Sequence, residues 1–134
     1  MDYLVLSVDP GRDKCGLALV SLSNGILIKK VVKTAELEQE INLMIHEHQP
    51  NTIIMGSGTW SKKLKSVVGS FHLPFEIVDE RHSTEQARLR FFKDHPPKGL
   101  MRLVPLGLQS PQVPYDDYAA VVLAERFFET RKER

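Results

Sequence analysis

Short runs of apolar and β-branched residues, separated by turn residues, dominate the first third of the chain. Three such runs lie at Leu4–Val8, Gly16–Leu22 and Ile26–Val32. Runs of this length and composition are typical of buried strands. Asp9-Pro10-Gly11 predicts a turn after the first run, and Asn24-Gly25 before the third is a strong hairpin signal because both residues tolerate positive φ. The first three elements are therefore predicted to form an antiparallel meander.

The spacing of apolar residues becomes helical after residue 34. An amphipathic helix is predicted over residues 35–48, because its apolar positions recur every three or four residues, at Leu37, Ile41, Met44 and Ile45. Thr34 is predicted to cap this helix, and acidic residues in its first turns suit the helix dipole. Pro50 ends it.

Strands and helices alternate in the rest of the chain. Strands are predicted at Thr52–Met55 and Phe75–Val78, with a helix near residues 60–69 between them. Ser83 and Gln86 have capping-box spacing for a helix near residues 84–93. A final helix is predicted over residues 116–131, and its core-facing side chains are Tyr118, Val121, Val122, Ala124 and Phe128.

The order of these elements predicts the fold class. Three meander strands followed by alternating helices and strands indicate an α/β fold, with one mixed sheet and helices packed on it. A chain of 134 residues has the size of one ordinary domain, so we expect residues 1–134 to form a single domain. Residues 94–114 contain five prolines and are predicted to be a long loop that is either functional or mobile.

Composition excludes several classes of protein. Cys15 is the only cysteine, which rules out a disulfide framework and a cysteine-rich zinc site. No apolar run approaches the roughly 18 residues of a membrane span, so no membrane partner is expected. The first residues lack the pattern of a signal peptide, and a cytoplasmic location is the expectation.

The net charge of +1 names no partner, but its distribution is uneven. Residues 57–102 carry nine basic and five acidic side chains, whereas the segments on either side are slightly acidic. This middle third is the surface that could face a polyanion, although a solvated helix face explains the same pattern. Trp60 lies in this segment, where it either stacks a base or packs against the protein.

Acidic residues stand at the ends of three separated elements. Asp9 closes the first strand, Glu80 follows Asp79 after the fifth, and Asp116 and Asp117 open the last helix. Each has an ordinary interpretation, as a turn cap, a surface ion pair or a helix cap. If the fold gathers three carboxylates, their mutual repulsion requires a cation, and all-oxygen ligation favours Mg²⁺ or Mn²⁺ over zinc. Two such ions serve phosphodiester hydrolysis.

Three motifs taken together resemble one protein family. They are Val8-Asp9-Pro10-Gly11 with Gly16-Leu17-Ala18, the block from Val78 to Ala87 with Asp79-Glu80-Arg81, and Asp116-Asp117-Tyr118-Ala119-Ala120-Val121. Their order resembles the YqgF (RuvX) family of Holliday-junction-resolvase-like proteins, also described as pre-16S rRNA processing nucleases. Two features depart from it: Gly56-Ser57-Gly58 stands where the family usually has Gly-x-Pro, and the loop over residues 94–114 is longer.

The resemblance implies a ribonuclease H-like fold, in which the first three strands of a five-stranded mixed sheet are antiparallel. It implies a metal-dependent nuclease in which Asp9, Glu80 and Asp116 are catalytic and hold Mg²⁺ or Mn²⁺, with Asp117 as an adjacent metal ligand. The side chains expected to hold nucleic acid are basic, and they are Arg12, Lys14, Lys62, Lys63, Lys65 and Arg81.

Three functions remain open at the level of sequence. The first is processing of the 5′ end of precursor small-subunit rRNA, with a ribosomal assembly intermediate as partner. The second is resolution of four-way DNA junctions, for which a homodimer would make the paired cuts. The third is a non-catalytic module that binds nucleic acid or acts in ribosome assembly. Three convergent carboxylates favour a nuclease over a binding module, because they would repel phosphate.

Overall fold

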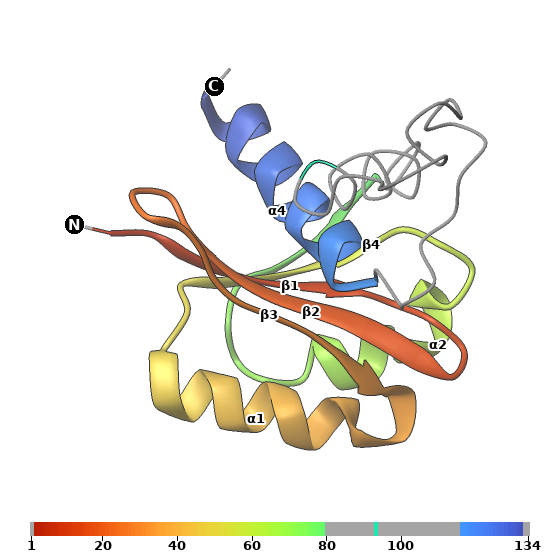
Figure 1. Cartoon of the computed structure of the whole chain (residues 1–134). Helices are drawn as coiled ribbons and strands as arrows, with labels where there is room; N and C mark the ends of the chain where they lie inside the picture. Colours follow the sequence, from red (N-terminus) through yellow and green to blue (C-terminus); the bar gives the residue numbers. More distant parts are fainter. Residues whose placement is uncertain (1, 80–92, 94–115, 133–134) are drawn as a thin grey trace, which may run out of the picture.

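A computed structural model describes residues 2–79, 93 and 116–132 of the chain (Figure 1). In this part the strands are β1 (Leu4–Asp9), β2 (Lys14–Ser21), β3 (Gly25–Lys33), β4 (Thr52–Gly56) and β5 (Phe75–Val78). The helices are the 3₁₀ turn η1 (Thr34–Glu36), α1 (Leu37–His48), α2 (Ser61–Val68) and α4 (Asp116–Lys132). The predicted strands and helices within the described residues are thus confirmed, with ends that differ by a few residues.

The strands form one mixed sheet in the order β3-β2-β1-β4-β5. β1 pairs antiparallel with β2, and β2 with β3, which confirms the meander. Gly25 has a φ of +77° in the hairpin between β2 and β3, as the Asn-Gly signal predicts. β4 pairs in parallel with β1, and β5 with β4. The carboxyl ends of β1, β4 and β5 consequently meet at one edge of the sheet.

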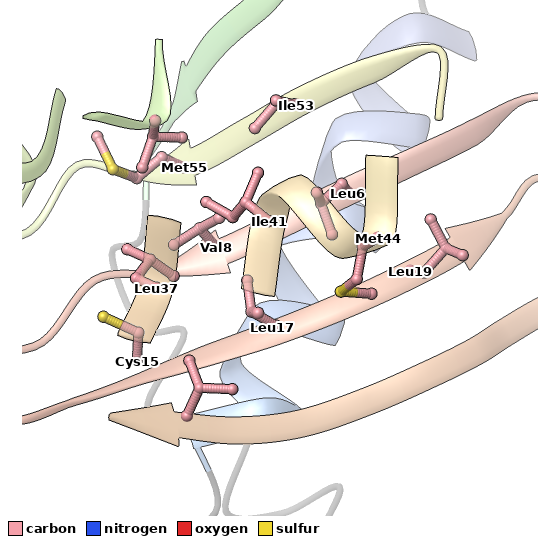
Figure 2. Packing of buried hydrophobic residues seen from close by; sticks show 12 residues of the cluster. Leu6, Val8, Cys15, Leu17, Leu19, Leu37, Ile41, Met44, Ile53 and Met55 are labelled. Atoms are coloured by element: carbon pink, nitrogen blue, oxygen red, sulfur yellow. The ribbon is translucent and has the colours of Figure 1, made fainter. Parts of the chain in front are cut away.

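Helices cover both faces of the sheet (Figure 1). On one face α1 and α2 pack over a core in which Leu37, Ile41 and Met44 of α1 lie against side chains of the sheet (Figure 2). The sheet residues of this core are Leu6, Val8, Cys15, Leu17, Leu19, Val32, Ile53 and Met55. All are at most 9% exposed, so the apolar face of α1 is held by burial rather than by capping.

α4 crosses the opposite face of the sheet (Figure 1). Val5 of β1, Ala18 and Val20 of β2 and Ile54 of β4 pack against it. The five side chains of α4 that the sequence placed in the core are all buried. Alternation along β1 therefore assigns Leu6 and Val8 to the α1 side, and Val5, Ser7 and Asp9 to the α4 side.

The sequence was wrong about the cap of the first helix. Thr34 makes no capping hydrogen bond, and the residue at the N-cap of η1 is Lys33. The Thr34 hydroxyl donates instead to the carbonyl of Gly11, at 2.9 Å. The helix predicted near residues 84–93 and the loop over 94–114 lie outside the described residues, apart from the single helical residue 93. No helix in the described part has the length and apolar character of a bilayer span.

Candidate functional site

Asp9 is the last residue of β1, the central strand of the sheet. It is half-buried, stands opposite Gly16 of β2 and follows Val8, which pairs with Met55 of β4. Its neighbours on the α4 side of the strand are Ser7 and Val5. Since Gly16 brings no side chain across the strand pair, the carboxylate of Asp9 is placed at an open end of the sheet by a fixed backbone.

The turn after Asp9 is fastened to the start of η1. The Thr34 hydroxyl donates to the Gly11 carbonyl at 2.9 Å, and the Thr34 amide donates to the Asp13 carbonyl at 2.9 Å. The buried thiol of Cys15 lies 3.3 Å from the Thr34 hydroxyl oxygen. A Cβ at Gly11 would lie 2.1 Å from the carbonyl oxygen of Lys14, so only glycine fits this turn. These contacts hold the segment that carries Asp9 in one position.

A polar side chain is buried two residues before Asp9, on the same face of β1. Ser7 is fully buried, pairs with Ala18 of β2 and Ile54 of β4, and points to the α4 side. Within the described part of the chain, its hydroxyl oxygen has no hydrogen-bond partner. An unpartnered buried hydroxyl is costly, by about 1–3 kcal/mol. The sheet thus carries a polar atom beneath the candidate site that no described neighbour satisfies.

The first turn of α4 meets the same face of the sheet through Lys29. Lys29 of β3 stands opposite Ala18, in the same cross-strand row as Ser7. Its ammonium lies 3.5 Å from an Oδ2 oxygen of Asp117 and 4.4 Å from the ring centre of Tyr118. The other oxygen of Asp117 accepts the backbone amide of Tyr118, at 3.0 Å. The Asp117 carboxylate is therefore engaged on both of its oxygens.

The surroundings of Lys29 favour its charged form. Partial burial lowers the pKa of Lys29, but a hydrogen bond with Tyr118 and the charge of Asp117 outweigh that effect, and the net pKa is raised. The protonated ammonium of Lys29 consequently faces the carboxylate of Asp117. This pair ties the start of α4 to the sheet two cross-strand rows away from Asp9.

Three of the predicted site residues have side chains outside the part of the chain that the structure describes. Glu80 and Arg81 lie outside the described residues, as does the side chain of Asp116. The chain that leads to Glu80 is described as far as Asp79. The carbonyl of Asp79 accepts a hydrogen bond from the side chain of Arg126 of α4, at 2.9 Å. The amide of Ser57, just after β4, donates to the carbonyl of Val78 at 3.0 Å. The end of β5 is thus tied to both α4 and β4.

Basic side chains flank this edge of the sheet. Arg12 and Lys14 are exposed in the turn after Asp9 and at the start of β2. The three lysines predicted to hold nucleic acid, Lys62, Lys63 and Lys65, are exposed on α2. α2 follows β4, whose last residue, Gly56, lies at the same edge as Asp9. All five predicted cations within the described residues are therefore accessible; two lie in or beside the turn after Asp9, and three lie on α2, which packs on the other face of the sheet.

The fit of this site to a divalent cation is partial in the described residues. No group of three acidic, histidine or cysteine side chains is close enough there to hold a metal ion. Two features nevertheless suit a hard cation. The predicted donors are all carboxylates, which Mg²⁺ and Mn²⁺ prefer, and the unpartnered hydroxyl of Ser7 lies beneath Asp9. Such a cation would use Asp9 together with the predicted ligands that lie outside the described part.

The sequence missed two residues that shape the site. Lys29 gave no signal, because a lysine in a partly exposed strand is ordinary and its partner lies 88 positions away. Thr34 was assigned to the helix that follows it, whereas its hydroxyl serves the turn 23 residues earlier. In both cases only the fold brings the partners together.

Comparisons with known proteins show the fold of this chain. No family model matches the sequence, and neither does any curated protein. Among solved structures, that of RuvC from Thermus thermophilus matches with a TM-score of 0.57 and 16% identity, over 97% of this chain and 96% of RuvC. The same protein in complex with a Holliday junction substrate matches with a TM-score of 0.57 and 15% identity, over 96% of both chains. The chain thus has the ribonuclease H-like fold, and at this identity the likeness extends to the fold alone.

Proposed function

We propose that this protein is a metal-dependent endonuclease that hydrolyses phosphodiester bonds in structured nucleic acid. One observation carries the proposal: Asp9 ends the central strand on the face covered by α4, and Lys29 of β3 holds Asp117, in the first turn of α4, at that face. The likeness to RuvC supports it, because RuvC, which shares this fold, forms a complex with a Holliday junction substrate. The basic side chains at the same edge fit a phosphate backbone.

In this proposal Asp9, Glu80 and Asp116 hold the metal. Asp117 is a weaker candidate than Asp116, because its two oxygens are engaged by Lys29 and by the amide of Tyr118. Bound Mg²⁺ or Mn²⁺ would stabilise developing negative charge on the phosphate and make water a stronger nucleophile. Asp9, fixed by its strand and by the fastened turn, would hold such a cation in one position at the end of β1.

The basic residues position the substrate in this proposal. Arg12 and Lys14 are close enough to Asp9 in sequence to hold the phosphates next to the cut. The lysines of α2 and Arg81 extend the contact along the backbone. Contacts of this kind fix the register of the nucleic acid without reading its sequence.

We propose precursor small-subunit rRNA, cut near its 5′ end, as the substrate, because three motifs of the sequence resemble those of the YqgF family. Four-way DNA junctions are the second candidate, favoured by the RuvC complex, and paired cuts would then require a homodimer. A non-catalytic binding module of the same fold is the third. It has no use for an acidic residue held at the edge of the central strand.

The test is a cleavage assay with two labelled substrates, a precursor rRNA fragment and a four-way DNA junction. Each is incubated with the full chain in Mg²⁺, in Mn²⁺ and in EDTA. We expect cleavage of one substrate in either metal and none in EDTA. Binding of both substrates without cleavage in either metal would contradict the nuclease proposal and favour the binding module. Cleavage of the junction alone would replace rRNA processing with junction resolution.

A further inference from the structure

The loop and helix that follow β4 carry the only tryptophan of the chain, Trp60. The loop is fixed at both ends, because Ser57 donates to the carbonyl of Val78 and Ser61 donates to the carbonyl of Gly58, each at 3.0 Å. Trp60 itself accepts the amide of Leu64 at its carbonyl, at 3.1 Å. These hydrogen bonds make the backbone at Trp60 rigid. Trp60 is half-buried, so part of its side chain is accessible.

A lysine covers this ring. The ammonium of Lys63 lies 4.3 Å from the centre of the Trp60 ring, which is a cation–π contact. The exposed lysines of α2 have no acidic partner, since each ion pair in the described part of the chain lies elsewhere. Two of them, Lys62 and Lys63, lie in the first turn of α2, which lacks acidic residues. The helix dipole disfavours cations there, so stability of the helix does not account for them.

We propose that Trp60 and Lys63 form a binding site for one unpaired nucleotide. The base stacks on the ring face that Lys63 covers, and the displaced ammonium binds the adjoining phosphate. A cation over an exposed ring changes an equilibrium by about two- to fivefold. A base stacked on an aromatic ring changes it by about fivefold to more than a hundredfold. The exchange is therefore favourable even before Lys63 gains its phosphate contact.

The position of this site defines the substrate class, and this step rests on the proposed function. Gly56 lies beside Asp9 at the sheet edge, and at most about 14 Å of backbone separates Gly56 from Trp60. That span covers a few nucleotides, at about 3.4 Å of rise for each stacked one. Bases inside a duplex already stack on each other and cannot reach the ring. The nuclease would thus prefer substrates with unpaired nucleotides a short distance from the cut.

Intrinsic fluorescence tests this site directly, because Trp60 is the only tryptophan. The full chain is titrated in EDTA with a single-stranded oligonucleotide and with an abasic strand of equal length and charge. Labelled strands report binding by anisotropy in parallel. We expect the strand with bases to quench Trp60 on binding and the abasic strand to bind more weakly without quenching. Binding without quenching, or absence of single-strand binding, would overturn the proposal.

Two variants separate stacking from charge. Trp60→Leu is expected to weaken binding of the normal strand fivefold or more and to leave the abasic strand unchanged, with Trp60→Phe in between. Lys63→Met is expected to weaken binding of both strands. It should also reduce the salt dependence of binding by about the amount that one phosphate contact contributes. Lys30→Met is the matched control, since Lys30 pairs with Glu40 on the α1 side. An unchanged ratio of normal to abasic affinity in Trp60→Leu would overturn the proposal.

These measurements are independent of cleavage. Quenching by the base in a protein that never cuts would contradict the proposed nuclease while the nucleotide site stands. Metal-dependent cleavage by a protein whose Trp60 fluorescence does not change on binding single strands would contradict the nucleotide site while the proposed nuclease stands.

Discussion

The ion pair between Lys29 and Asp117 makes a measurable contribution to stability that does not require metal. At the observed 3.5 Å, two unit charges attract by about 1 kcal/mol in water and by about 5 kcal/mol at an effective dielectric constant of 20. The side chain of Lys29 is 33% exposed and that of Asp117 13%, so solvent screening reduces the larger figure strongly. We expect a coupling energy of about 1 kcal/mol.

A double-mutant cycle measures this coupling. Lys29→Met, Asp117→Asn and the double variant are unfolded by urea in EDTA, together with the wild type. Lys29→Met also loses the contact with the Tyr118 ring, worth about 0.5–1 kcal/mol, but that loss cancels in the cycle. High salt should reduce the coupling, because one partner is partly exposed.

The same variants distinguish Asp117 from Asp116 as a metal ligand. If Asp117 serves mainly Lys29, Asp117→Asn loses stability and keeps most of its cleavage activity, whereas Asp116→Asn loses activity. A coupling below about 0.2 kcal/mol, or loss of cleavage in Asp117→Asn at wild-type stability, would refute this reasoning.

Three further substitutions test the frame around Asp9. Gly11→Ala is expected to lower the free energy of unfolding by about 1–3 kcal/mol or more and to reduce cleavage, because its Cβ would meet the Lys14 carbonyl; wild-type urea unfolding would contradict this. Thr34→Val removes the hydrogen bond to Gly11 at constant volume and should cost about 1 kcal/mol by the same measurement, a stabilised variant being the contrary result. Ser7→Ala removes a buried hydroxyl that has no hydrogen-bond partner in the described part of the chain, so it should raise the midpoint of thermal unfolding, by a gain of about 1 kcal/mol; a lower midpoint would show that the hydroxyl has a partner.

The sequence predicted those parts of the fold that depend on local pattern. β5 was predicted with its observed ends, because a short apolar run is bounded by turn residues on each side. The hairpin before Gly25 followed from the tolerance of glycine for positive φ, although the connection has three residues, 22–24, and Gly25 is the first residue of β3. The core face of α4 followed from helical spacing, since Val121, Ala124 and Phe128 recur on one side.

The candidate site depends on contacts between distant segments, and the sequence predicted less of it. Asp9 could be found because a carboxylate at a strand end precedes a turn with Pro and Gly. The ion pair between Lys29 and Asp117 could not be predicted, because nothing in the sequence shows that β3 and the start of α4 lie side by side. Thr34 was misassigned because a threonine before a helix has two uses for its hydroxyl, and the distant one prevails here. The same long-range contacts hold Asp9 in place.

Cleavage by Asp9→Asn tests the central claim most directly. The substitution removes one charge at nearly constant volume, so circular dichroism and thermal unfolding should match the wild type. Asp13→Asn is the matched control, because Asp13 is an exposed carboxylate in the same turn. We expect Asp9→Asn to lose metal-dependent cleavage of the preferred substrate and Asp13→Asn to keep it. Wild-type cleavage by a folded Asp9→Asn variant would contradict the account.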